Sequence, residues 1–168
     1  LKGKIALITG SNRGVGLSIL KKFSENGAEV IACARNESEE FEKMIFDISK
    51  KYKNKITPVY FDLRKGNEIT KGLEKIETIS SKIEIIVNNA GVNQVSLFQM
   101  TSIDKIKEVF DINFFSHLKL TQRLMKILIK NKKGSIINIS SNAAEECDAG
   151  RSAYASSKAT LIAFTKVL

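Results

Sequence analysis

The stretch Thr9–Gly16 (TGSNRGVG) lies between an apolar run and an amphipathic segment. The preceding residues Lys4–Ile8 (KIALI) are nearly all apolar, as in a strand that is covered on both faces. The following residues Leu17–Phe23 (LSILKKF) repeat apolar side chains at the spacing of a helix. The sequence therefore predicts a strand, a glycine-rich turn and a helix in direct succession.

The three glycines of this turn have separate predicted roles. Backbone N–H groups at the start of a helix are unpaired and carry the positive end of the helix dipole, so a phosphate group can bind there if no side chain blocks it. We expect Gly10 to form the sharp turn after the strand, Gly14 to let the backbone approach a ligand, and Gly16 to let the helix pack closely on the sheet. Turn formation and packing alone, without a ligand, are the alternative interpretation.

Apolar runs and amphipathic segments alternate along the rest of the chain. This alternation predicts an α/β protein with a three-layer, doubly wound parallel sheet of the Rossmann type, in the strand order 3-2-1-4-5. Ligands of such sheets bind at the carboxyl ends of strands one and four, where the winding reverses. The expected strands are Lys4–Thr9, Glu29–Ala34, Ile56–Phe61, Ile83–Asn88 and Ser135–Ser140, and the expected helices are Gly14–Asn26, Glu37–Lys51, Gly66–Ser80, Ser102–Asn131 and Arg151–Leu168.

We expect residues 1–168 to form a single domain. The last predicted helix runs to the end of the sequence, which favours a fold whose C-terminal strands are absent from this chain. The longest apolar runs are too short to span a membrane and no apolar leader is present, so a cytoplasmic location is expected. Cys33 and Cys147 lack the spacing of a disulfide or zinc site, and no metal is expected. The surroundings of Cys147 give no sign of a reactive thiol.

The net charge is +9, and much of it comes from the lysine clusters Lys50–Lys55 and Lys130–Lys133. Basic residues at the ends of helices complement the negative end of the dipole, which is our first interpretation of both clusters. A surface that attracts an acidic partner is the alternative. Because no nucleic-acid motif or aromatic interleaving accompanies the lysines, we expect no nucleic-acid partner. No membrane partner is expected either, because no apolar run is long enough to span a membrane.

Three motifs occur in a fixed order along nearly the whole chain: TGxxxGxG at Thr9–Gly16, NNAG at Asn88–Gly91 and YxxxK at Tyr154–Lys158. The spacing of the first differs from the GxGxxG of other dinucleotide-binding folds. Together the motifs resemble those of the short-chain dehydrogenase/reductase family. The resemblance implies a single NAD(P)-binding domain, oxidoreductase activity and a homo-oligomer, either a dimer or a homotetramer.

Four residues are the expected catalytic group. Tyr154 and Lys158 share one helix face, and an ammonium group beside a phenol lowers the phenol pKa from its usual value of about 10, which makes a usable proton donor. Ser141, just after the fifth strand, is expected to hold a carbonyl oxygen near the phenol. The resemblance adds Asn113, which in this family distorts its helix and supports a proton relay through a water on its backbone carbonyl.

The predicted cofactor is NADP(H) rather than NAD(H). NAD-specific folds place an acid at the end of the second strand, but here Ala34 occupies that place, and Arg35 and Arg13 are suited to a 2′-phosphate. Asp62 and Leu63 match a pair that contacts adenine, although Asp62 is also a candidate helix cap. The expected cofactor-binding residues are Gly10, Ser11, Asn12, Arg13, Gly14, Val15, Gly16, Arg35, Asp62, Leu63, Asn89, Ala90, Gly91, Tyr154 and Lys158.

Within the family, the sequence is most similar to the 3-oxoacyl-acyl-carrier-protein reductases of fatty acid biosynthesis. This implies NADPH-dependent reduction of a 3-oxoacyl thioester on acyl carrier protein to the 3-hydroxyacyl form. Carrier proteins are acidic, so Lys130, Lys132 and Lys133 are a candidate docking face. The only histidine, His117, is expected to be structural.

One departure from these reductases keeps other functions open. Glu145, Glu146 and Asp148 stand where small or apolar residues are usual, between Ser141 and Tyr154. They are either a solvated loop or part of a pocket for another substrate, such as a sugar, a steroid or a small alcohol or ketone. A module that binds NADPH without turnover, as a sensor or scaffold, is the alternative from a different class.

Overall fold

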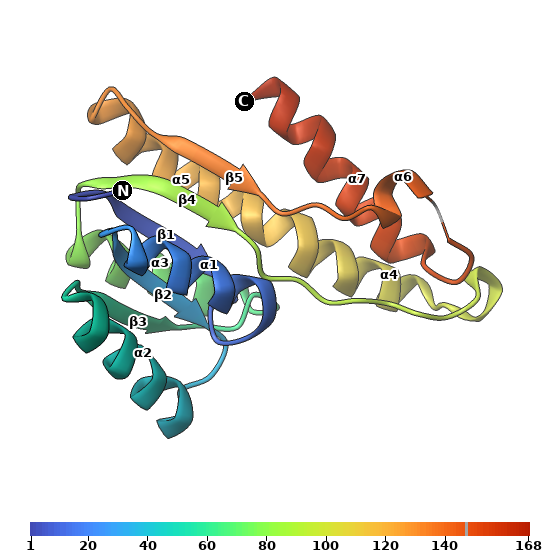
Figure 1. Cartoon of the computed structure of the whole chain (residues 1–168). Helices are drawn as coiled ribbons and strands as arrows, with labels where there is room; N and C mark the ends of the chain where they lie inside the picture. The colour runs from blue at the N-terminus through green and yellow to red at the C-terminus, as the bar shows by residue number, and fades with distance from the viewer. Residues whose placement is uncertain (147) are drawn as a thin grey trace.

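The computed structural model describes residues 1–146 and 148–168. Five parallel strands form one sheet in the order β3-β2-β1-β4-β5, as predicted (Figure 1). The central pairing places Leu7 of β1 opposite Ile31 of β2 on one side and Ile86 of β4 on the other. The strands are β1 Ile5–Thr9, β2 Glu29–Ala34, β3 Ile56–Tyr60, β4 Ile83–Asn88 and β5 Ser135–Asn138. Cys147 lies outside the described residues.

Helices cover both faces of the sheet. One core contains the apolar side chains of α1 and α2, and the other contains those of α3 and α5. The long helices are α1 Gly14–Glu25, α2 Glu39–Tyr52, α3 Gly66–Ile79, α4 Ile103–Phe110, α5 Ser116–Lys130 and α7 Ser152–Val167. Among the described residues, no helix is both long enough and apolar enough to cross a lipid bilayer.

The predicted helix Ser102–Asn131 is interrupted. A π-helical turn, η2 Asp111–Phe115, separates α4 from α5 and contains Asn113. The buried Asn113 side chain forms hydrogen bonds outside its own helix, and the wider turn accommodates this position. The distortion expected at Asn113 is therefore present.

The start of one helix and two short helical segments differ from the prediction. α2 begins at Glu39 rather than Glu37, because the Ser38 hydroxyl accepts a hydrogen bond from the N–H of Phe41 at 3.2 Å and caps the helix. Two short helices, η1 Phe98–Met100 and α6 Ala143–Glu146, lie in segments that were expected to be loops. Their few residues carry too little periodicity to be recognised from sequence.

Candidate active site

The glycine-rich turn joins β1 to α1 at the carboxyl edge of the sheet. Gly10 has a φ of +66°, and a Cβ atom there would lie 2.9 Å from Cα of Ala90. A Cβ atom at Gly16 would overlap the carbonyl oxygen of Gly10 and the Nδ2 atom of Asn89. These contacts agree with the predicted turn and packing roles. At Gly14 the φ is +53° and nothing lies within 4 Å of the Cβ position, so the helix start is open on that side.

The segment that follows β4 is held against this turn by side-chain hydrogen bonds. The Thr9 hydroxyl accepts from the N–H groups of Asn89 and Ala90 at 3.0 and 3.1 Å, and donates to the carbonyl of Val87 at 3.3 Å. Nδ2 of Asn89 donates to the carbonyl of Thr9 at 2.9 Å. Nδ2 of Asn88 donates to Oδ1 of Asn138 at 2.8 Å and so joins β4 to β5.

Two buried residues hold the same segment from the helix side. Asn113 accepts from the N–H of Val92 at 2.8 Å and donates to its carbonyl at 3.0 Å. Nε2 of His117 lies 2.7 Å from the Ala90 carbonyl and must donate to it, since a carbonyl only accepts. Burial is the main reason that the pKa of His117 is lowered to about 4, so the ring is neutral near pH 7.

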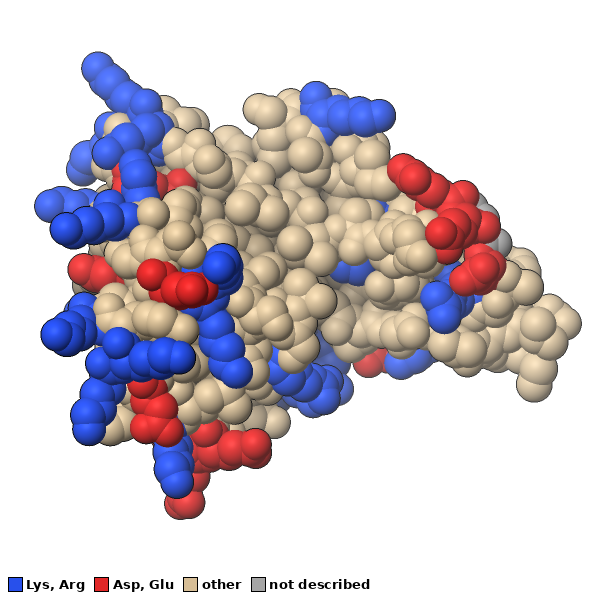
Figure 2. Space-filling view, viewed as in Figure 1, with Lys and Arg blue, Asp and Glu red and all other residues tan. Residues whose placement is uncertain are grey.

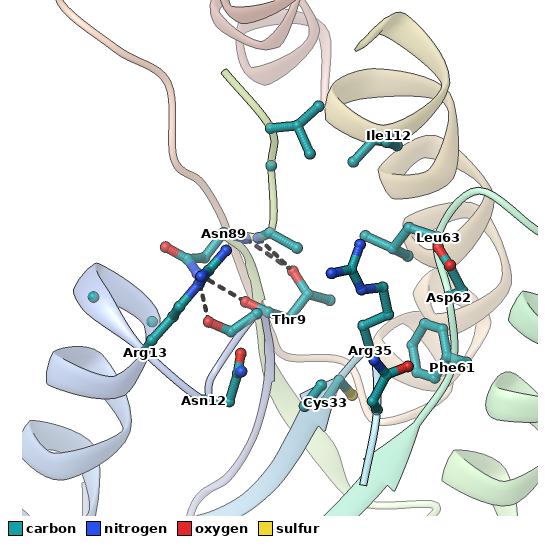
Figure 3. A pocket seen from close by; sticks show the side chains of 18 of the residues that line it. Thr9, Asn12, Arg13, Cys33, Arg35, Phe61, Asp62, Leu63, Asn89 and Ile112 are labelled. Atoms are coloured by element: carbon teal, nitrogen blue, oxygen red, sulfur yellow. Dashed lines mark hydrogen bonds between the residues drawn. The ribbon is translucent and has the colours of Figure 1, made fainter. Parts of the chain in front are cut away.

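A cavity of about 600 Å³ opens beside the glycine-rich turn (Figure 3). It extends from the start of α1 across the ends of β2 and β3 to the segment after β4. The predicted cofactor-binding residues that line it are Gly10, Asn12, Arg13, Gly14, Val15, Gly16, Arg35, Asp62, Leu63, Asn89, Ala90 and Gly91.

Ser11, one of the expected cofactor-binding residues, does not line this cavity. Its side chain is fully buried, and both its hydroxyl and its N–H donate to the Cys33 carbonyl at 3.0 Å. Four lining residues were missed by the sequence reading: Asn36, Glu37, Ser38 and Arg64. Glu37 and Ser38 were assigned to a helix that in fact begins at Glu39, and Asn36 lay between that predicted helix and the second strand. For Arg64, the only sign in the sequence that it lines the cavity was its position directly after Asp62 and Leu63.

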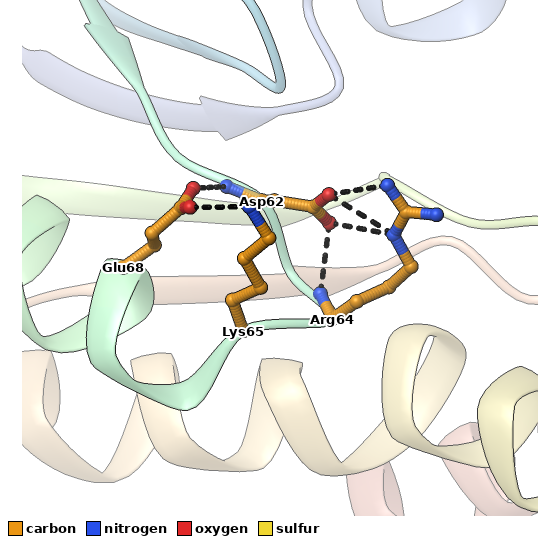
Figure 4. Close-up of polar contacts among 4 residues, drawn as sticks. All are labelled: Asp62, Arg64, Lys65 and Glu68. Carbon is orange, nitrogen blue, oxygen red and sulfur yellow. Dashed lines mark hydrogen bonds and ion pairs between the residues drawn. The ribbon is translucent and has the colours of Figure 1, made fainter.

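Asp62 is bound by Arg64 at the end of β3 (Figure 4). The Arg64 guanidinium donates through Nε at 3.0 Å and Nη2 at 2.5 Å to one carboxylate oxygen, and the Arg64 N–H reaches the other at 2.9 Å. These bonds hold the pKa of Asp62 below its usual value. α3 starts after Lys65 without a side-chain cap, so the alternative role of Asp62 as a helix cap is wrong.

Tyr154 and Lys158 lie one turn apart on α7, as expected. The Lys158 side chain is buried, and its Nζ donates to the carbonyl of Ile139 at 2.7 Å. A Cβ atom placed on Gly91 would lie 3.5 Å from this Nζ and 3.1 Å from Oδ1 of Asn113. Burial lowers the pKa of Lys158 to about 8, which leaves it mostly protonated at pH 7.

The rest of the expected catalytic group is close in the fold to this lysine. Ser140, next to Ser141, donates its hydroxyl to the Lys158 carbonyl at 2.8 Å. Asn113 donates to the Ser157 hydroxyl at 2.9 Å, which in turn donates to the Tyr154 carbonyl at 2.7 Å. Ser141, Tyr154 and Lys158 do not line the 600 Å³ cavity, which ends near Val92 and Ile112. The expected catalytic residues therefore lie next to this cavity, with Gly91 and Asn113 between them.

Acidic residues follow Ser141 on the surface. Glu145 and Glu146 are exposed on α6, and Asp148 pairs with Arg151 at 3.5 Å. In Figure 2 acidic side chains form a patch on this side of the molecule. Within residues 1–146 and 148–168, no group of three or more His, Cys, Asp or Glu side chains is arranged to hold a metal ion.

Comparison with known proteins adds to this geometry. The family model for short chain dehydrogenases matches residues 4–168. The 3-oxoacyl-acyl-carrier-protein reductase FabG of Aquifex aeolicus is 35% identical over 168 residues, which are 100% of this chain and 67% of that protein. Its counterpart from Chlamydia muridarum is 33% identical with the same coverage.

A solved structure shares the fold. The L-sorbose reductase of Gluconobacter frateurii, in complex with NADPH and L-sorbose, has a TM-score of 0.93 at 24% identity. That match covers 99% of this chain and 63% of the other. The chain thus spans about two thirds of the length of the relatives it matches.

Proposed function

Because the chain belongs to the short chain dehydrogenase family, we propose that it is an NADPH-dependent carbonyl reductase with Tyr154 as its proton donor. One observation carries the proposal: Lys158 holds a charge in a buried position, one helical turn from Tyr154 and beside Gly91. Burying an ammonium group costs stability, so a purely structural residue at this site would be expected to be apolar.

The residues of the cavity fit a dinucleotide. Its volume of about 600 Å³, the open space beside Gly14 and the unblocked start of α1 suit a pyrophosphate and an adenosine. Arg13 and Arg35 line it, and Ala34 leaves no acid at the end of β2, which favours a 2′-phosphate. When bound, the reduced nicotinamide supplies a hydride to the carbonyl carbon.

Residues of this chain supply the proton and the positioning. The Tyr154 hydroxyl gives its proton to the carbonyl oxygen, and the Lys158 ammonium stabilises the phenolate that remains. Ser141 donates a hydrogen bond to the same oxygen and orients it. Asn113 positions the turn of α7 that carries Tyr154, through the Ser157 hydroxyl, and fixes the backbone of Val92.

The proposed substrate is a 3-oxoacyl thioester carried by acyl carrier protein, which the FabG relatives support. The lysines suggested as a docking face lie at the amino ends of the strands, away from Ser141. Lys133 and Ser141 are eight residues apart along an extended segment, roughly 26 Å. A carrier bound to those lysines would face away from the cleft.

A second substrate class is favoured by the acidic surface after Ser141. Glu145 and Glu146 are exposed on α6, so they repel an acidic carrier protein and suit a neutral polyol or a cationic ketone. The L-sorbose reductase, which has the same fold, acts on a free sugar.

Following NADPH absorbance with two kinds of substrate separates these functions. Oxidation with a carrier-bound acetoacetyl thioester supports the first substrate class, and oxidation with free ketoses alone supports the second. The Tyr154→Phe variant is expected to lose at least about 100-fold in kcat, while the Kd for NADPH stays within about threefold of the parent. A variant as active as the parent contradicts the mechanism. NADPH binding without turnover of any carbonyl substrate would support a sensor or scaffold.

A further inference from the structure

The amino edge of the sheet carries an excess of positive charge. We define this edge as residues 1–4, 50–55, 80–84 and 130–134, which precede β1, β3, β4 and β5 or begin them. It contains ten lysines and one acid, Glu84. Figure 2 shows lysine and arginine side chains along the side of the molecule where the strands begin. The lysines are Lys2, Lys4, Lys50, Lys51, Lys53, Lys55, Lys82, Lys130, Lys132 and Lys133.

Helix dipoles account for only a small part of these lysines. The helices α1, α2, α3 and α5 end at this edge, and each C-terminus carries about half a negative charge, roughly two charges in all. Even with Glu25 and Glu29 of the neighbouring α1–β2 connection, the lysines outnumber the acids ten to three. The negative charge of the helix ends is therefore too small to explain the two lysine clusters, contrary to our first interpretation of them.

Most of these lysines have no ion-pair partner. Lys4 and Lys133 both pair with Glu84, at 3.0 and 2.6 Å. None of the other eight pairs with an acid among the described residues. Neighbouring strands are about 4.8 Å apart, which is less than the Debye length of about 8 Å at physiological ionic strength, so lysines at the starts of adjacent strands are only partly screened from one another.

Two of the lysines occupy backbone positions that favour glycine. Lys53 ends α2 with a φ of 54°, and Lys132 follows α5 with the same φ. Side chains are strained in this left-handed region, and glycine is the usual residue after a helix. At both positions the chain has a lysine where a glycine would be more stable, which points to a use for the charge.

We propose that the amino edge binds an anionic lipid surface. A plane of lipid headgroups requires only clustered positive charge, and each lysine near the surface strengthens binding about fivefold. Ile129 is 69% exposed beside Lys130 and can reach the headgroup layer. We expected no membrane partner because no segment is long enough to span a membrane. Binding to the surface of a membrane does not need such a segment.

Nucleic acid fits the same edge less well. The four segments contain no arginine, and their one aromatic residue, Tyr52, is half-buried with the Lys51 ammonium over its ring. Stacking platforms for bases are therefore missing. Helix C-termini rather than N-termini face this edge, so no helix offers its N–H groups to a phosphate. A lipid surface bound to the amino edge leaves the cleft at the opposite edge of the sheet accessible.

Co-sedimentation with vesicles tests the proposal independently of the reductase activity. The protein is expected to bind vesicles of phosphatidylcholine with 30% phosphatidylserine at 50 mM NaCl, but neither pure phosphatidylcholine vesicles nor the mixture at 500 mM NaCl. The double variant Lys53→Gly, Lys132→Gly is expected to reduce the partition coefficient roughly tenfold or more. Its Tm is expected to rise by roughly 2–6 °C, because both strained positions are relieved.

A matched control removes the same charge elsewhere. Lys43 and Lys71 are exposed in the middle of α2 and α3, and Lys43→Gln, Lys71→Gln is expected to leave partitioning within about threefold of the parent. The proposal is overturned if the parent ignores anionic vesicles, if the control loses as much as the glycine variant, or if the glycine variant gains stability and binds unchanged. Preferential binding of duplex DNA at equal phosphate concentration would assign the edge to nucleic acid instead.

Discussion

Replacing Thr9 with valine tests how the site is held together. The Thr9 hydroxyl is buried and accepts from two backbone N–H groups, those of Asn89 and Ala90. Valine has nearly the same shape, so no cavity forms, but both donors lose their partner. A buried donor without an acceptor costs about 1–3 kcal/mol. With two such donors, Thr9→Val is therefore expected to lower the free energy of unfolding by about 2–6 kcal/mol.

Thr9→Ser is the matched control, because it keeps the hydroxyl and removes one methyl group, at a cost of about 1 kcal/mol. Equilibrium unfolding in urea measures both variants, and calorimetric titration with NADPH measures the effect on the segment Asn89–Gly91, which lines the cavity. The Kd is expected to rise more in Thr9→Val than in Thr9→Ser. Equal unfolding free energies for the two variants would refute the reasoning.

Three further predictions follow from individual groups. The pKa of His117 is about 4 when folded and about 6.5 when unfolded, so the stability of the protein is expected to fall as the pH drops from 6.5 to 4. The urea midpoint of His117→Gln should fall less than that of the parent over the same pH range. Burial lowers the pKa of Lys158 to about 8, so the unfolded chain binds more protons than the folded chain between pH 8 and 10.5. Over that range the free energy of unfolding of the parent should therefore rise relative to that of Lys158→Met. Parallel pH profiles for the two proteins would contradict this. Gly16→Ala should raise the Kd for NADPH at least about tenfold in fluorescence titrations, because its Cβ atom overlaps Gly10 and Asn89, whereas the exposed Ser18→Ala should change it less than threefold.

The architecture follows from patterns within short windows of sequence. Buried parallel strands appear as continuous apolar runs and helices as apolar residues at 3.6-residue spacing, so the strand order and most boundaries were predicted correctly. Tyr154 and Lys158 are also a local feature, since residues four apart share a helix face. The Ser11 side chain donates to the Cys33 carbonyl of β2, a direction that no local pattern encodes.

Only the tertiary structure decided which distant groups meet. Thr9 reaches Asn89 across 80 residues and Asn113 reaches Val92 across 21, so these bonds depend on how the elements pack rather than on any local spacing. In the same way, four lysine-bearing segments that lie far apart in the sequence converge on one edge of the sheet. The sequence by itself determined the layered fold and the motifs, because periodicity and glycine conformation act locally. The packing of strands and helices decided the buried environment of Lys158 and the convergence of the lysines, because charge and burial depend on neighbours far apart in the chain.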